Sequence, residues 1–212
     1  GERTADAIRA RFDGWEIEDL WLPYFCMSTN LTQGRAQIHR GGDVPTALRA
    51  SVAIPGAFPP VPFGDDLLVD GGVTNNLPVD VMRRLYPTAE IVAVQVAPAK
   101  GPKAKADYGL SVSGWQAMKS KVGRGPRYPG LIAVLMRSMI TGSLDQQEAA
   151  IDSGAADLLL DIDMRGVGLL DFERVVEVAN LGYDAAMPML EAWLTQRREA
   201  GKDVPGVAAH RS

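Results

Sequence analysis

The stretch LLVDGGVTNNLPVD, residues 67–80, decides the fold because it joins a short apolar segment to a helical one through two glycines. The run LLVD predicts a buried strand, and Pro78 favours the first turn of a helix that follows. Asp70 therefore stands at the carboxyl end of a strand, where the active sites of open α/β sheets lie. Gly71 and Gly72 let the backbone turn sharply and approach a neighbouring segment closely.

An Asp-Gly pair is also a common signal for a hairpin turn, and that alternative gives Asp70 a structural role only. A hairpin needs a second strand beyond the turn, whereas VTNNLP leads into helical sequence. This context favours a functional aspartate, although the spacing alone leaves both interpretations open.

Helices and strands alternate on both sides of this stretch, which indicates an α/β protein with one core or at most two small ones. Residues 91–98 are nearly all apolar, as is typical of a strand covered on both faces in a parallel sheet. The last helix is expected to follow a cap at Asp171, to kink at Pro188 and to end at Gly201. The expected strands are residues 23–31, 36–40, 67–70, 91–98 and 157–164, and the expected helices are residues 4–12, 46–53, 78–86 and 172–199.

Composition excludes several classes of function. The chain has 22 basic and 26 acidic residues and a net charge of −4, so no overall positive field exists to hold nucleic acid. Its single cysteine, Cys26, cannot form an internal disulfide, and with two histidines it lacks the ligands of a zinc site. Asp65 and Asp66 follow a glycine and predict a polar turn and not a metal site. We expect no metal and no cofactor.

A Ser-His-Asp triad also finds little support. His210 lies in a polar tail, so His39 alone could serve, and no acid or nucleophile stands near it in the sequence. We therefore expect a structural hydrogen bond at His39, structural hydroxyls at Ser28 and Ser51, and a small core residue at Cys26.

Two blocks, residues 47–61 (ALRASVAIPGAFPPV) and 67–84 (LLVDGGVTNNLPVDVMRR), resemble the second catalytic block of the patatin-like phospholipases. Residues 17–32 (IEDLWLPYFCMSTNLT) and 107–116 (DYGLSVSGWQ) narrow the resemblance to the neuropathy target esterase branch. The similarity runs in order over most of the chain. Its specificity comes from the joint occurrence of these blocks.

The resemblance implies a Ser-Asp dyad and a three-layer α/β/α fold with a mainly parallel central sheet. It also implies hydrolysis of the carboxylic esters of lysophospholipids or phospholipids. Residue by residue, Asp70 matches the dyad aspartate, and Gly71 and Gly72 match the rest of its motif. The residues themselves agree, because where histidine is scarce a carboxylate is the remaining candidate to accept a serine proton.

The family also needs a glycine-rich oxyanion loop and a G-x-S-x-G nucleophile elbow, both upstream of the quoted blocks. Residues 109–114, GLSVSG, hold Ser111 and Ser113 without the matching glycines, and residues 166–171, GVGLLD, end in aspartate. Neither segment fits the elbow. We therefore expect no nucleophile in this chain, which would supply only half of the dyad.

The expected organisation is the C-terminal part of a catalytic domain, residues 1–201, followed by a flexible tail, residues 202–212. No apolar run reaches the roughly 18 residues of a spanning helix and no signal peptide is recognised, so we expect a cytoplasmic protein or one peripheral at the cytoplasmic membrane face. Residues 100–127 hold seven Lys/Arg and one acid, and residues 129–140 are apolar. Together they predict contact with lipid, the alternative being a solvated loop over a core helix.

Two functions follow from these observations. The first is a serine esterase of lysophospholipids or phospholipids to which this chain contributes Asp70, the chain alone being inactive. The alternative is a non-catalytic patatin-like module for binding or assembly. A G-x-S-x-G sequence encoded upstream would distinguish the first from the second.

Overall fold

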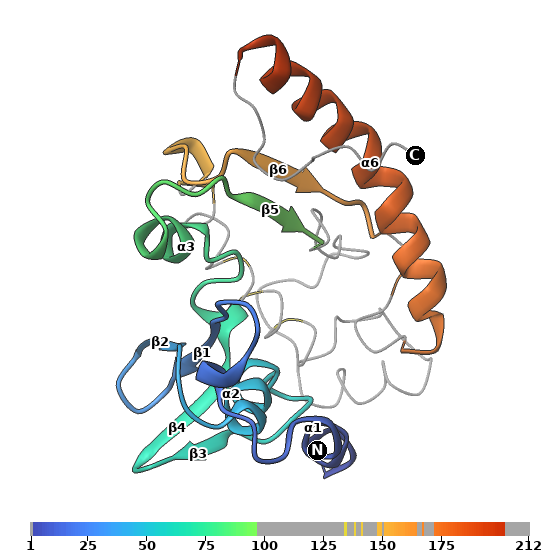
Figure 1. Ribbon diagram of the computed structural model, residues 1–212. Coiled ribbons are helices and arrows are strands. Elements are labelled where there is room, and N and C mark those ends of the chain that lie inside the picture. Colours follow the sequence, from blue (N-terminus) through green and yellow to red (C-terminus); the bar gives the residue numbers. More distant parts are fainter. Residues whose placement is uncertain are drawn as a thin grey trace, which may run out of the picture. The chain divides into compact units, whose positions relative to one another are not determined.

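The computed structural model describes residues 2–96, 151–164 and 172–201, together with residues 134, 138, 141, 148, 149 and 167 (Figure 1). These residues form two compact units: the first comprises residues 2–78 and the described residues from 134 to 149, and the second comprises residues 79–96 and those from 151 onward. None of the helices described is long and apolar enough to cross a membrane. The predicted tail and the basic segment 100–127 lie outside the described residues.

A four-stranded sheet forms the centre of the first unit. Its strand order is β2-β1-β4-β3, so that β1 and β4 are the inner strands (Figure 1). All five residues of β1 are buried, and Leu68 and Val69 of β4 are 0% and 2% exposed. The strands are β1 (Cys26–Asn30), β2 (Arg35–His39), β3 (Val61–Phe63) and β4 (Asp66–Asp70).

Every strand pair in this sheet is antiparallel, which corrects the expectation of a mainly parallel sheet for this part of the chain. The physical reason lies in the connections. Residues 31–34 join β1 to β2, and Gly64 and Asp65 join β3 to β4, whereas a parallel pair needs a crossover of about a dozen residues or more. Gly64 has a φ of 59° in its turn, as the predicted polar turn requires. The short strand β3 was missed because prolines surround it.

Helices α1 (Glu2–Phe12) and α2 (Val44–Ser51) pack together, and α2 packs on β1. Asp43 caps α2, since its Oδ2 accepts a hydrogen bond from the Thr46 amide at 2.8 Å, and Pro45 occupies the first turn. The short 3-10 helix η1 (Ile17–Asp19) adds Ile17 to the core. This core cluster consists of Ile17, Cys26, Val44 and Ala47.

The second unit has a two-stranded sheet of β5 (Val92–Gln95) and β6 (Leu158–Asp161), paired in parallel as the sequence predicted. The expected burial of β5 on both faces is wrong, since Val92 and Val94 are 43% and 51% exposed. Helix α3 (Val79–Leu85) precedes β5, and helix α6 (Val175–Glu199) follows the 3-10 helix η3 (Phe172–Arg174). Pro188 lies inside α6, which continues on both sides of it, and Gly201 ends the helix with a φ of 67°. The predicted cap, Asp171, lies outside the described residues.

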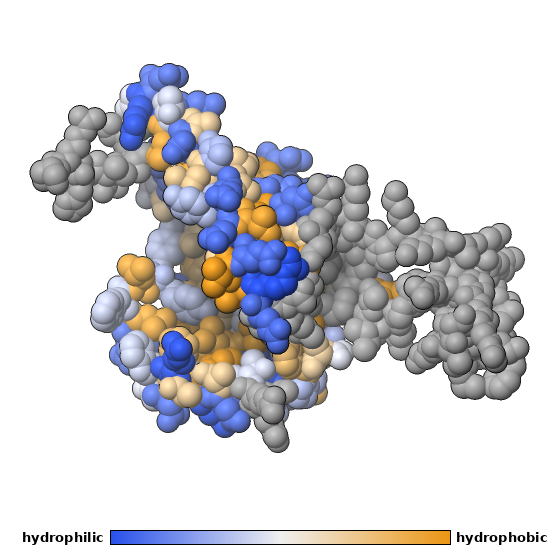
Figure 2. Space-filling model, turned by 90° about the vertical axis from the view of Figure 1, so that its right-hand side faces the viewer, coloured by the Kyte–Doolittle hydropathy of each residue, from blue (hydrophilic) through white to orange (hydrophobic). Residues whose placement is uncertain are grey.

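Asp157 connects the strands and helix α3 within the second unit. Its Oδ2 accepts hydrogen bonds from the Ile91 amide at 2.8 Å and from Arg83 Nη2 at 2.7 Å. Arg83 also donates to the carbonyl of Ala89, so one arginine joins the end of α3 to the start of β5. Apolar residues reach the surface beside polar ones (Figure 2), and α6 has no buried residue among those described.

Candidate active site

Asp70 is the last residue of β4 and lies directly opposite Ser28 of β1 in the antiparallel register. Its backbone amide donates to the carbonyl of Ala53 at 3.0 Å, which ties the end of the strand to the segment after α2. The neighbouring β4 residues Leu68 and Val69 are buried, whereas Asp70 is half-buried. The carboxyl group therefore lies at the end of an inner strand, next to the buried part of the sheet.

The chain beyond Asp70 forms a 3-10 helix, η2 (Gly71–Val73), and not the second strand of a hairpin. Asp70 caps this helix, because its Oδ1 accepts a hydrogen bond from the Gly72 amide at 2.7 Å. Helix α3 then begins at Val79, as the sequence predicted. The hairpin interpretation of Asp-Gly is therefore wrong, while a capping role for Asp70 is established.

The two glycines are needed for space and not for a left-handed backbone, since neither has a positive φ. A Cβ on Gly71 would stand 2.5 Å from the carbonyl oxygen of Met27. A Cβ on Gly72 would stand 2.9 Å from Asn76 Oδ1 and 3.1 Å from Asp70 Oδ1. At position 71 only glycine lets η2 lie this close to the β1 backbone, so the close approach expected from the sequence is confirmed there, whereas a side chain at position 72 meets only the ends of side chains.

The Thr29 hydroxyl holds the backbone of Asp70, and the Thr74 hydroxyl contacts Thr29. Thr29 Oγ1 donates to the Asp70 carbonyl at 2.9 Å and lies 3.0 Å from Thr74 Oγ1. The Thr74 hydroxyl also lies 3.4 Å from the Gly71 carbonyl, to which it donates, so it is shared between Thr29 and the first residue of η2. Sequence reasoning missed this pair. The signal for it was the run of three polar residues, Ser28 to Asn30, inside a strand with apolar neighbours.

Burial sets the acidity of this carboxyl group. Desolvation raises the pKa of Asp70 above its ordinary value of 3.8, and the hydrogen bond from the Gly72 amide opposes that rise. A raised pKa makes the ionised carboxylate a stronger base than an exposed aspartate. Since Oδ1 is engaged by Gly72, Oδ2 is the oxygen best placed to take a proton.

Ser28 and His39 form a second polar contact in the same sheet. Ser28 Oγ lies 2.8 Å from His39 Nε2, and the two residues are 0% and 5% exposed. Burial lowers the pKa of His39, which favours the neutral imidazole. The rings of His39 and Phe63 pack in a T-shaped arrangement, with ring centroids 5.8 Å apart. The structural hydrogen bond expected for His39 is thus confirmed.

The remaining candidates have structural contacts. Asp66 Oδ2 accepts hydrogen bonds from Asn30 Nδ2 at 2.8 Å and Gln33 Nε2 at 2.6 Å. Among the residues that the structure describes, no group of three His, Cys, Asp or Glu side chains could hold a metal ion. Cys26 is buried as predicted, and desolvation raises the pKa of its thiol. Ser111 and Ser113 lie outside the described residues.

Residues 1–83 match the family model described as patatin-like phospholipase. A lysophospholipase NTE1 from Scheffersomyces stipitis is 30% identical over 181 residues, which cover 84% of this chain and 12% of that protein. Another from Lodderomyces elongisporus is 32% identical over 197 residues, or 91% of this chain and 13% of that protein. The chain belongs to the patatin-like phospholipase family.

A putative patatin-like phospholipase domain-containing protein from Caenorhabditis elegans is 29% identical over 196 residues, which cover 90% of this chain and 18% of that protein. The resemblance drawn from the sequence is thereby confirmed, and the patatin-like match includes Asp70, Gly71 and Gly72. The chain spans 12% to 18% of the length of these three relatives.

Proposed function

We propose that the complete protein is a serine hydrolase of lysophospholipid or phospholipid carboxylic esters, in which Asp70 is the base of a Ser-Asp dyad. The observation that carries the proposal is the half-buried Asp70 carboxylate, whose pKa burial raises and whose backbone is fixed by Thr29 and Ala53. The names of the NTE1 relatives support the substrate class. The nucleophile and the oxyanion donors come from other parts of the protein, which complete a three-layer α/β/α domain.

In the proposed reaction the serine hydroxyl attacks the ester carbonyl and its proton passes to Asp70. The tetrahedral intermediate collapses, the glycerol oxygen leaves, and Asp70 returns the proton to it. Water then attacks the acyl-enzyme while Asp70 accepts its proton, and Asp70 returns that proton to the serine oxygen as the bond to the fatty acid breaks. This chain alone is therefore inactive, and activity falls as the pH drops through the raised pKa of Asp70.

The test is Asp70→Asn in the complete protein, with lysophosphatidylcholine as substrate. The amide keeps the size of the side chain and can still cap η2, but it cannot accept the serine proton. We expect turnover to fall about 100- to 10,000-fold with the thermal midpoint nearly unchanged. Asp65→Asn is the matched control, because Asp65 is exposed in the turn between β3 and β4.

Normal hydrolysis by Asp70→Asn would remove Asp70 from the mechanism and leave it the role of a helix cap. Absence of turnover and of serine labelling by a fluorophosphonate in the unaltered complete protein would favour the binding or assembly module instead.

A further inference from the structure

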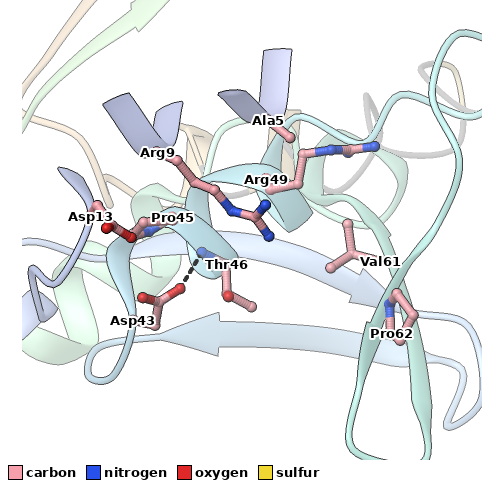
Figure 3. Close-up of a pocket in the computed structure, with 9 residues that line it drawn as sticks. All are labelled: Ala5, Arg9, Asp13, Asp43, Pro45, Thr46, Arg49, Val61 and Pro62. Atoms are coloured by element: carbon pink, nitrogen blue, oxygen red, sulfur yellow. Dashed lines mark hydrogen bonds between the residues drawn. The ribbon is translucent and has the colours of Figure 1, made fainter. Parts of the chain in front are cut away.

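A cavity of about 450 Å³ opens in the first unit between α1, α2 and β3 (Figure 3). Its volume lies within the range of small-molecule sites. Two arginines, two aspartates and a threonine line the cavity together with two prolines. The polar lining residues are Arg9, Asp13, Asp43, Thr46 and Arg49. Asp70 is not among the lining residues, so the cavity is separate from the candidate active site.

Arg49 carries a hydrogen-bond donor without an acceptor. Its Nη2 donates to the carbonyl of Pro59 at 3.2 Å, and its guanidinium lies over the ring of Phe58 at 5.5 Å. Its other terminal nitrogen, Nη1, is buried and has no hydrogen-bond partner. A buried charged donor left unpaired is costly, so a rotation of the guanidinium that brings Nη1 to an anionic oxygen in the cavity would stabilise this side chain.

Arg9 supplies a second cation on the same cavity. Figure 3 shows its guanidinium reaching from α1 across the cavity toward Thr46 of α2. Within the described part of the chain, neither Arg9 nor Arg49 forms an ion pair with an acid. Guanidinium groups bind phosphate oxygens through short charge-assisted hydrogen bonds, frequently in pairs.

The two aspartates limit which anions fit. Asp43 Oδ2 already accepts a hydrogen bond from the Thr46 amide, so its charge is partly offset at the start of α2. Asp13 also lines the cavity and makes the formal charge of the lining zero. A doubly charged anion is therefore disfavoured relative to a singly charged one, such as dihydrogen phosphate or a phosphate diester that carries a cation at its other end.

We propose that this cavity binds a phosphate group through Arg9 and Arg49. The ligand is either free phosphate or the phosphodiester of a lipid headgroup, and the acids favour the zwitterionic headgroup. Binding here is independent of ester hydrolysis, because it requires neither Asp70 nor a nucleophile.

The experiment is isothermal titration of the full chain with inorganic phosphate and with glycerophosphocholine. We expect at least one probe to bind, and Arg9→Gln to weaken it about tenfold, the effect of losing one charge-assisted hydrogen bond. Arg11→Gln is the matched control, since Arg11 is exposed on the same helix and does not line the cavity. Binding of glycerophosphocholine alone identifies the headgroup as the source, and binding of phosphate alone identifies the free anion.

Arg49→Gln is expected to weaken binding as well, but it also removes contacts to Pro59 and Phe58. Arg49→Lys keeps the charge without the paired donors and serves as the milder variant, with unfolding measured alongside. The proposal is overturned if neither probe binds at millimolar concentration, if Arg9→Gln binds as tightly as the unaltered chain, or if Arg11→Gln weakens binding equally. Asp70→Asn should leave this binding unchanged, so the dyad and the phosphate site can fail separately.

Discussion

The two units of the chain differ in where they place their polar groups. In the first unit the polar residues lie inside the sheet: Ser28, Thr29 and Asn30 follow one another in β1 and are 0%, 4% and 1% exposed. In the second unit the polar contacts are part-exposed ion pairs: the side chains of Arg83 and Asp157 are 28% and 34% exposed, and those of Arg197 and Glu90 are 14% and 33% exposed. Buried hydrogen bonds are costly to break, whereas water can replace much of an exposed ion pair.

This difference explains why the candidate base stands in the first unit. A carboxylate that must meet a serine needs a fixed position, and the Asp70 backbone is held by Ala53 and Thr29. In the second unit the long helix α6 has no buried residue among those described, and its Val175 and Val176 are 65% and 71% exposed. The comparison is tested most directly by making the same type of substitution once in each unit and comparing the two effects.

Glycine to alanine should have opposite effects in the two units. In Gly71→Ala the added Cβ would lie 2.5 Å from the Met27 carbonyl oxygen, so the backbone must shift. We expect a loss of about 1–3 kcal/mol in the free energy of unfolding, as for other overpacked sites. Gly182→Ala in α6 meets no atom within 4 Å and should stabilise the helix by about 0.5–1 kcal/mol.

Urea unfolding of the two alanine variants measures both changes. Gly71→Ala with the stability of the unaltered chain would mean that η2 can move away from β1 without cost. In that case the close approach of η2 to β1 would not be what fixes the position of Asp70.

Threonine to valine should give a smaller contrast. Thr29→Val keeps the shape but removes the hydrogen bonds to the Asp70 carbonyl and to Thr74. We expect it to cost about 1–3 kcal/mol and to lower the turnover of the complete protein, with Thr29→Ser restoring both. Thr195→Val is the control, since its hydroxyl bonds the Glu191 carbonyl on an exposed helix surface, and its effect should stay within about 0.5 kcal/mol.

Unfolding and steady-state kinetics on the same variants separate the two roles of Thr29. A loss of stability without a change in turnover would leave Thr29 in the core and remove it from the positioning of Asp70.

Local patterns predicted most elements because each carries its own signal. Asp43 and Pro45 predicted the start of α2, and the apolar run at residues 91–98 predicted the parallel strand β5. The turn-like residues after β1 predicted that residues 36–40 pair back on it, and this is confirmed. The directions of β3 and β4 were not predicted, since they depend on which segments pair and not on the composition of any of them. The short connections after β1 and β3 held that information, but only once the missed strand β3 is recognised.

The site was predicted in part for a similar reason. Asp70, Gly71 and Gly72 form a contiguous motif, so sequence alone could place them together at the end of a strand. Thr29 meets Asp70 across 41 positions of the chain, and Thr74 meets Thr29 across 45. Contacts of this kind depend on the register of the strands, because a shift of one residue would turn every side chain of a strand to the opposite face of the sheet.

The smallest expected effect concerns pH, and it rests on His39. Burial lowers the pKa of His39 below its ordinary value of 6.5. Below about pH 6.5 the unfolded chain therefore binds a proton at this histidine more readily than the folded chain does. Stability from this residue is therefore complete above about pH 6.5 and falls as the pH drops toward the lower pKa of the folded state, by at most about 1.4 kcal/mol per pH unit. Asp70 acts in the opposite direction, because its raised pKa means that its contribution is lost as the pH rises.

The second unit has no histidine among its described residues, so mild acid should weaken the two units unequally. Amide hydrogen exchange, corrected for the intrinsic rate at each pH, should show β1 losing more protection than β5 between about pH 7 and about pH 5.5. His39→Gln keeps an amide that can reach Ser28 but does not titrate, and it should shrink that difference. If β1 loses the same protection in His39→Gln as in the unaltered chain, the acid sensitivity arises elsewhere, and the buried Ser28–His39 contact is insensitive to pH in this range.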